Sequence, residues 1–188
     1  KEVVVRDPET DKTIECYVDQ EITVEGTTYS LVYPCDRPVV IAYVDKEGDD
    51  EELVPLTDKD VEKIFPAAYK ACAAEDVELV NSAVVMTLQG DLPDEDDEDT
   101  DVDYGDVEED QELVRVFTTF EESGVEYVVT EPLDPVLIVV KPDSKVRKSK
   151  SAKPQFVLLT DDAELDKVMP AVNALLEEQA MEEEEASE

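Results

Sequence analysis

Histidine and tryptophan are absent from the sequence, and glycine is scarce, with five residues in 188. The lack of histidine excludes imidazole acid–base catalysis, Ser–His and Cys–His nucleophile pairs, and most catalytic zinc sites. None of the glycines forms a G-x-G-x-x-G or G-x-x-x-x-G-K-[ST] motif, so the nucleotide-binding loops built on those motifs are also excluded. We therefore predict a protein that is not an enzyme and holds no cofactor, with catalysis by carboxylates alone as an alternative.

Cysteine is rare as well. The three residues, Cys16, Cys35 and Cys72, form no C-x-x-C motif, and an odd number gives no disulfide framework. We interpret them as small buried or half-buried side chains of a protein in a reducing compartment. A redox role for Cys35, which lies in a predicted loop, is the alternative.

Long apolar runs are missing too. The longest, residues 135–140, has the length of a strand and is too short to cross a membrane, so we expect no membrane span. No signal or transit peptide is visible. Because the chain starts at Lys1 rather than at methionine, we expect that an upstream segment was removed or left out.

Positive charge is scarce in comparison with negative charge. Lys and Arg total 16, whereas Asp and Glu total 52, which gives a formal net charge of −36. This field repels phosphate backbones, so direct nucleic-acid binding is not expected. It favours a basic protein partner, or it serves solubility alone.

Two blocks of the sequence repeat. Residues 24–36 and 122–134 align without a gap and share four residues: Gly26 with Gly124, Tyr29 with Tyr127, Pro34 with Pro132 and Asp36 with Asp134. In the second block, residues 56–58 match 159–161 and, after a one-residue gap, residues 63–67 match 167–171. Two matching blocks in the same order predict an internal duplication.

The repeated residues suit structural roles. Each glycine lies where a hairpin turn needs a positive φ, and each tyrosine follows on the next strand, where we expect its ring to be buried. The Thr-Asp pairs at 57–58 and 160–161 offer helix N-caps. Pro66 and Pro170 are expected to kink or restart their helices.

The predicted fold class is α+β, with two similar units related by internal duplication, each a small antiparallel sheet with one C-terminal helix. The first unit covers residues 1–80 and the second 81–180, with an acidic insertion at 91–112 and an acidic tail at 181–188. Helices are predicted at 58–74 and 161–179. Strands are predicted at 2–6, 13–19, 21–24, 28–33, 38–44, 52–55, 83–89, 112–120, 126–131, 135–140 and 155–159.

The acidic insertion carries Asp or Glu at 14 of its 22 positions and no basic residue. Repulsion at this density predicts an extended or disordered segment. Residues 99–110 resemble part of a calcium loop, but Gly105 comes one position late and Asp110 stands where the motif needs Glu. No metal site is therefore predicted.

A basic segment, residues 141–153, contrasts with this acidic field. Its cations are Lys141, Lys145, Arg147, Lys148, Lys150 and Lys153, whereas the matching loop of the first unit, residues 45–52, is acidic. The two charged segments supply the predicted partner-binding residues: Asp94, Glu95, Asp96, Asp97, Glu98, Asp99, Lys145, Arg147, Lys148 and Lys150. The alternative is that both segments are solvated loops without a partner.

The repeat blocks resemble two families of small domains. Residues 7–11, 26–36 and 56–58 resemble the acidic bacterial domain of unknown function numbered 1292, and residues 105–179 resemble the companion domain numbered 3727 of cyanobacterial and plant chloroplast proteins. The resemblance implies a chloroplast stromal or cyanobacterial cytoplasmic setting. It implies no activity and no site residues.

Together these observations predict a non-catalytic binding or assembly factor that engages a basic protein partner, as an accessory protein of chloroplast complex biogenesis or gene expression. The first alternative is an acidic nucleic-acid mimic that regulates a nucleic-acid-binding protein. The second is the carboxylate-based enzyme.

Overall fold

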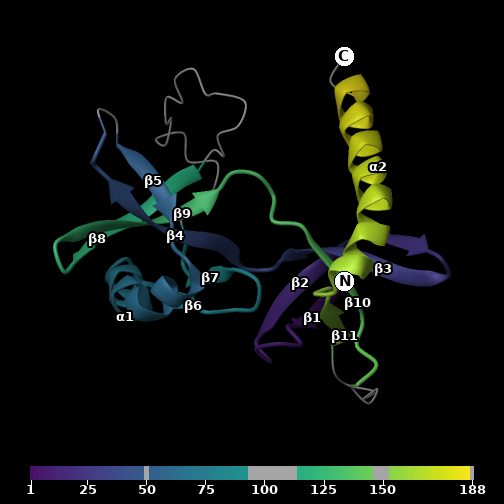
Figure 1. Cartoon of the computed structure of the whole chain (residues 1–188), viewed down its shortest axis with the longest axis horizontal. Helices are drawn as coiled ribbons and strands as arrows, with labels where there is room; N and C mark the ends of the chain where they lie inside the picture. Colours follow the sequence, from purple (N-terminus) through teal and green to yellow (C-terminus); the bar gives the residue numbers. More distant parts are fainter. Residues whose placement is uncertain (49–50, 93–113, 146–152, 187–188) are drawn as a thin grey trace. The chain divides into compact units, whose positions relative to one another are not determined.

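Strands make up most of the chain, with two helices, so the fold is mixed α+β. The computed structural model describes residues 1–48, 51–92, 114–145 and 153–186. The chain divides into two compact units (Figure 1). Unit 1 contains Lys1–Cys35 and Leu137–Glu188, and unit 2 contains Asp36–Val136.

Unit 1 is a closed barrel with one helix. Its strands are β1 (Glu2–Arg6), β2 (Thr13–Val24), β3 (Thr27–Pro34), β10 (Ile138–Pro142) and β11 (Gln155–Leu158), in the order β1-β11-β10-β3-β2, and its helix is α2 (Asp162–Ala186). β1 pairs with β11 in parallel, so the predicted purely antiparallel sheet is wrong here. The two strands come from opposite ends of the chain, and no hairpin between them dictates their direction.

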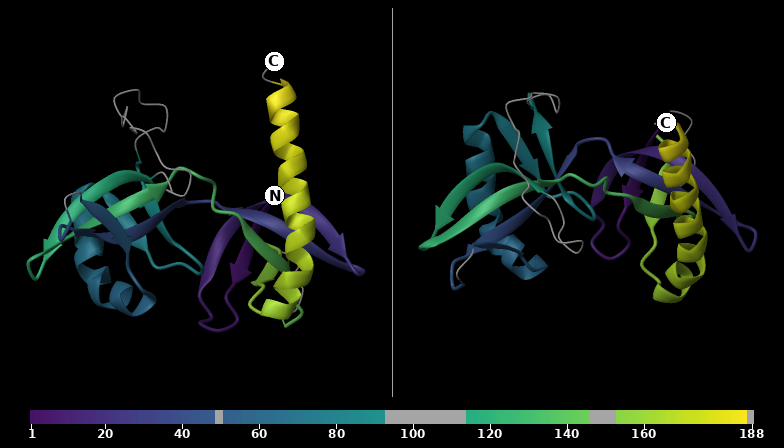
Figure 2. Two further views of the ribbon diagram at one scale, coloured as in Figure 1. Left: turned by 45° about the horizontal axis from the view of Figure 1, so that its top comes forward. Right: turned by 90° about the horizontal axis from the view of Figure 1, so that it is seen from above.

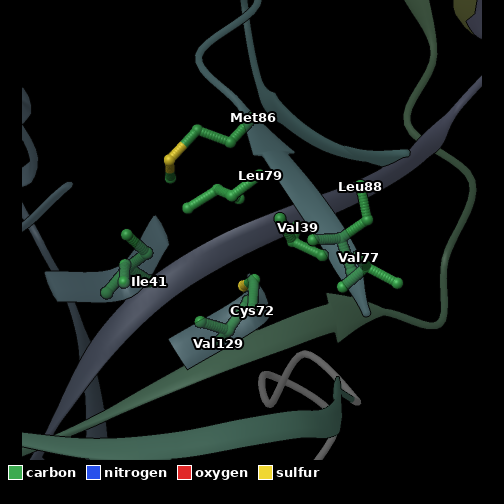
Figure 3. Packing of buried hydrophobic residues seen from close by; sticks show 9 residues of the cluster. Val39, Ile41, Cys72, Val77, Leu79, Met86, Leu88 and Val129 are labelled. Atoms are coloured by element: carbon green, nitrogen blue, oxygen red, sulfur yellow. The ribbon is translucent and has the colours of Figure 1, made fainter. Parts of the chain in front are cut away.

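Unit 2 is an open sheet with one helix. It contains β4 (Arg37–Asp45), β5 (Glu52–Pro55), α1 (Asp58–Ala74), β6 (Val77–Val80), β7 (Met86–Gly90), β8 (Val114–Glu122) and β9 (Val125–Pro132). The strand order is β6-β7-β4-β9-β8, and β5 pairs with β4. Val39, Ile41, Cys72 and Leu88 are among the buried residues of its core (Figure 3).

Two tight hairpins confirm the predicted turns. Glu25 and Gly26 have φ values of 49° and 82°, and Ser123 and Gly124 have values of 54° and 78°. Two central residues with positive φ form a turn whose twist matches that of antiparallel strands. A Cβ on either glycine would meet no atom within 4 Å, so glycine is favoured by the backbone conformation and not by crowding.

The pairing between strands crosses the predicted domain boundary. Val32 of β3 pairs with Ile138 of β10, and Thr130 of β9 pairs with Val40 of β4. The compact units therefore divide the chain at 35/36 and 136/137, whereas the predicted domains were residues 1–80 and 81–180. Sequence similarity identifies which segments are alike, but it does not say which of them pair.

Both helices begin near the predicted residues. Thr57 precedes α1 in an extended conformation, and its hydroxyl donates to Asp60 instead of capping a backbone N–H. Asp161 precedes α2 and accepts a hydrogen bond from the Glu164 N–H at 2.9 Å, as an N-cap does. Each helix continues through its internal proline.

Two elements depart from the sequence prediction. β6, Val77–Val80, was not predicted, although its side chains alternate between buried and more exposed. α2 continues to Ala186, through most of the predicted acidic tail. Glutamate, alanine and methionine all favour helix, and this propensity extends the element into residues that charge alone had marked as a tail.

The paired tyrosines both contribute to a core. Tyr29 is buried, as predicted, and packs with Leu31 and Leu159. Tyr127 is half-buried and stacks on Phe120, with ring centroids 5.4 Å apart. The prediction of a buried ring is thus confirmed for Tyr29, while Tyr127 packs at the margin of the unit 2 core.

Candidate protein-binding surface

The first half of α2 anchors this helix to the barrel of unit 1. Leu165, Val168, Val172 and Leu175 form an apolar stripe at helical spacing, and all four pack in the cluster that contains Tyr29. Val168 and Val172 are fully buried. This packing fixes the axis of the helix relative to the barrel.

A polar contact fixes the start of the same helix. Glu164 accepts a hydrogen bond from the Tyr29 hydroxyl at 2.9 Å and from Lys141 Nζ at 2.6 Å. The Lys141 hydrogen bond, more than that of Tyr29, lowers the pKa of Glu164 against the effect of burial. A carboxylate in the first turn also interacts favourably with the helix dipole.

The last turns of α2 have the opposite character. Residues 177–186 contain six glutamates, Glu177, Glu178, Glu182, Glu183, Glu184 and Glu185, and the last turn has no basic residue. All six are exposed. Negative charge in the last turn of a helix is unfavourable to the dipole, so the charges of the last glutamates act against the helix propensity of the same residues.

A further carboxylate, Asp19, acts on the same tyrosine as Glu183 of this helix end. Burial raises the pKa of Tyr33, and the charges of Asp19 and Glu183 raise it further. Asp19 is exposed and falls at the bulge of β2, where the pairing with β3 shifts between Val18 and Gln20. We call residues 177–186 together with Asp19 the acidic surface; Figure 2 shows α2, which carries most of it, in two further views.

The predicted partner-binding residues are described only in part. Asp94, Glu95, Asp96, Asp97, Glu98, Asp99, Arg147, Lys148 and Lys150 lie outside the described residues. Lys145 is described, and its backbone N–H donates to Asp143 Oδ1 at 3.0 Å. The structure therefore places Lys145 beside a buried carboxylate.

Two other lysines of the basic segment are engaged within unit 1. Lys141 binds Glu164, as described above, and Lys153 lies 2.9 Å from carboxylate oxygens of both Glu2 and Glu15. Hydrogen bonds to Glu2 and Glu15 raise the pKa of Lys153. Both ends of the basic segment are thus tied to acidic side chains of the barrel and its helix.

Buried charges in each unit are paired with arginine. In unit 1, Asp143 accepts from Arg6 Nη2 at 2.8 Å and Nε at 3.0 Å. Burial would raise the pKa of Asp143, but the Lys145 N–H and Arg6 lower it below its ordinary value. In unit 2, Glu131 lies 3.4 Å from Arg37 and 3.7 Å from Arg115. These pairs join strands and serve the fold.

The cysteines match their sequence interpretation. Cys16 and Cys72 are buried, Cys35 is half-buried, and none of the three is in a disulfide. Burial, with a smaller effect of Cys35, raises the pKa of Cys16 to about 12. Burial, with a smaller effect of Glu75, raises that of Cys72 to about 11. Thiols with such pKa values are poor nucleophiles at neutral pH.

A comparison with family models matches residues 76–179 to a family described as a protein of unknown function, DUF3727. The chain belongs to this family. The DUF3727 match runs from β6 into α2, and so includes the anchored half of that helix. Comparison with curated proteins and with solved structures gave no match.

The DUF3727 match confirms that residues 105–179 resemble the 3727 family. The resemblance of the first half of the chain to the 1292 family stays a prediction. Neither helix in the described ranges has an apolar stretch of the kind that crosses a membrane.

The acidic surface itself was missed in the sequence, because residues 181–188 were interpreted as a tail. Helix propensity summed over 176–186 is the signal that could have identified it.

Proposed function

We propose that the two halves of this chain are copies of one module and that the copies have exchanged their C-terminal parts. The hairpin β2–β3 of the first copy pairs with β10 of the second, and the hairpin β8–β9 of the second copy pairs with β4 of the first. This arrangement is that of a domain-swapped dimer whose two subunits are joined in one chain.

Strand register supports the proposed duplication. The pair Val32–Ile138 in unit 1 matches the pair Thr130–Val40 in unit 2, with the same spacing of 98 residues that relates Gly26 to Gly124. The bulges match as well, since the register shifts between Val18 and Gln20 in β2 and between Val116 and Thr118 in β8. Agreement of pairing, turn and bulge favours common descent of the two copies.

We further propose that the protein is a non-catalytic binding factor that engages a basic protein partner through the acidic surface of unit 1. The observation that carries this proposal is the end of α2, where six exposed glutamates follow one another and the last of them lie at the negative end of the helix dipole. These negative charges oppose the stability of the helix. A cationic partner that neutralises them would explain why the helix carries them.

The anchored half of α2 makes this surface suitable for recognition. The apolar stripe and the Glu164 contacts hold the helix before any partner binds, so little conformational entropy is lost on binding. The family resemblance favours a chloroplast stromal or cyanobacterial cytoplasmic setting, with a role in complex biogenesis or gene expression.

Affinity purification with a matched pair of variants tests this function. In the α2 variant, the six glutamates of residues 177–186 become glutamine. In the control variant, six exposed glutamates elsewhere become glutamine: Glu9, Glu21, Glu47, Glu52, Glu62 and Glu78. Both variants lose the same net charge, and proteins retained from an extract of expressing cells are identified at low and moderate salt.

We expect the same basic proteins to be retained by the wild type and the control variant and lost by the α2 variant. Equal losses from both variants would show a non-specific effect of net charge and would contradict the proposal. Release of the retained proteins by added DNA would support nucleic-acid mimicry instead.

A further inference from the structure

A groove of about 460 Å³ lies in unit 2 between α1 and β8. The helix lines it with Lys63, Ala67, Lys70 and Ala71, which lie on one helical face, and the strand contributes Phe120. The alanines and Phe120 give the apolar part of the lining, and the aliphatic stems of lysines can extend it while their ammonium groups stay in water. The charge of Lys63 is offset by Asp60, whose carboxylate lies 3.3 Å away.

The strand side of the groove is the edge of a sheet. β8 is last in the strand order, and among the described residues its outer edge has no strand partner. Phe120 packs toward the core, so Glu122 lies on the same face and Glu121 on the opposite one. Glu121 and Glu122 both line the groove. An unpaired edge beside a groove that is lined by both apolar and charged side chains is suited to the addition of an extended peptide.

Unit 1 shows why this groove is open in unit 2. In the proposed duplication, the strand register matches Glu122 with Val24. The helix blocks 63–67 and 167–171, continued along each helix, match Ala71 with Leu175. Val24 and Leu175 pack against the apolar cluster of unit 1. A carboxylate and a methyl group in their place leave the space between helix and strand unfilled.

We propose that the groove binds an extended peptide segment with alternating apolar and basic side chains, which adds as a strand to the edge of β8. Residues opposite each other on neighbouring strands share a face, so apolar side chains would enter the space beneath α1. The alternate, basic side chains would then lie beside Glu121 on the open face. This inference rests on the proposed function in that the partner is basic.

Binding is measured with the full chain and a fluorescein-labelled octapeptide of alternating lysine and valine, by fluorescence anisotropy. The double variant Ala71→Leu and Glu122→Val introduces the side chains that fill the matching space in unit 1. We expect it to weaken binding at least about tenfold, and we expect Glu121→Gln to weaken binding and reduce its salt dependence. Thermal unfolding checks that each variant is folded.

Two further peptides test the manner of binding. N-methylation of alternate residues removes the N–H groups on one side of a strand. One set of N-methyl positions should abolish binding, and the other set should leave it nearly unchanged. Equal effects of the two sets would overturn strand addition. A peptide of alternating glutamate and valine should bind at least about tenfold more weakly; equal affinity, or no binding of either peptide, would overturn the proposal.

The α2 variant separates this inference from the proposed function. If the lysine–valine peptide loses affinity for the α2 variant but not for the groove variants, the groove is not the binding site and the acidic surface still is. If dilution changes the oligomeric state of the protein and the groove variants remove that change, a second copy of the chain occupies the groove and the peptide proposal is wrong.

Discussion

Glu164 joins three elements of unit 1, because it lies in α2 and accepts hydrogen bonds from β3 and β10. We predict that Glu164→Gln destabilises the protein by about 1–3 kcal/mol, since a charge-assisted hydrogen bond to Lys141 is lost. Urea unfolding measures the loss, with Glu178→Gln as an exposed control in the same helix. A loss no larger than the change in the control would show that the contact does not hold the helix.

The same carboxylate predicts a dependence on pH. The pKa of Glu164 is lowered in the folded protein, so its stabilisation is present above the pKa of the unfolded chain and is lost as pH falls through the folded value. The difference in unfolding free energy between wild type and Glu164→Gln should be constant near neutral pH and shrink below about pH 4.3. A difference that persists in acid would assign the effect to packing.

The two tyrosines of the repeat should differ in their contribution. Tyr29→Ala is predicted to cost roughly 3–5 kcal/mol, because a fully buried ring leaves a cavity. Tyr127→Ala should cost less, because that ring is half-buried at the margin of its core. Denaturant unfolding of both variants gives the comparison, and equal costs would contradict it.

Individual residues show how far sequence reasoning reaches. Gly26, Gly124 and Tyr29 could be placed because a turn needs positive φ and a repeated aromatic indicates a core. The groove residues Ala71 and Glu122 could not, because an alanine and a glutamate carry no signal of their own. They become informative only when the pairing shows which residues of unit 1 they replace.

At the scale of elements, the function that we propose for α2 opposes the stability of the helix. Replacing its six terminal glutamates by glutamine should raise the unfolding free energy by about 1–2 kcal/mol, because like charges are removed from the negative end of the dipole. Thermal unfolding at low salt measures the gain, which should decrease at high salt. A loss of stability would show that the glutamates have a structural role.

The acidic insertion yields a prediction of a different kind. β7 pairs with β4 and β6, and β8 pairs with β9, so the two strands that flank the insertion are each paired elsewhere. Replacing residues 93–113 with a short glycine–serine linker should leave the melting temperature nearly unchanged and flatten the salt dependence of binding to a basic partner. Unfolding of this variant would show that the segment is structural.

For the molecule as a whole, the compact units define which pieces should fold alone. Residues 36–136 form unit 2 without interruption and should fold as a separate chain, as should residues 1–35 joined by a linker to 137–188. Residues 1–80 alone should not fold as a monomer, because β3 then lacks β10, and β4 lacks β7 and β9. Amide NMR spectra and size-exclusion chromatography distinguish these outcomes.

The sequence predicted the mixed α+β class, most strands and both helix starts, because each depends on local pattern. It did not predict that β3 pairs with β10 and β4 with β9. If the two halves are copies, as we propose, they offer equivalent strands to each other, and nothing in the repeated blocks distinguishes this pairing from one within each half.

The pairing of the first strands with the last ones also sets an order of events during synthesis. β1, β2 and β3 leave the ribosome first, yet β3 pairs with β10 and β1 with β11, which are made after the whole of unit 2. At about 5–20 residues per second, the interval for residues 36–136 is roughly 5–20 seconds. During that time the N-terminal hairpin has unpaired edges, and the sheet of unit 2 is complete only at the end of it, when β9 has been made. The nascent chain is therefore most exposed to aggregation, and most in need of a chaperone, until residues 137–188 have emerged.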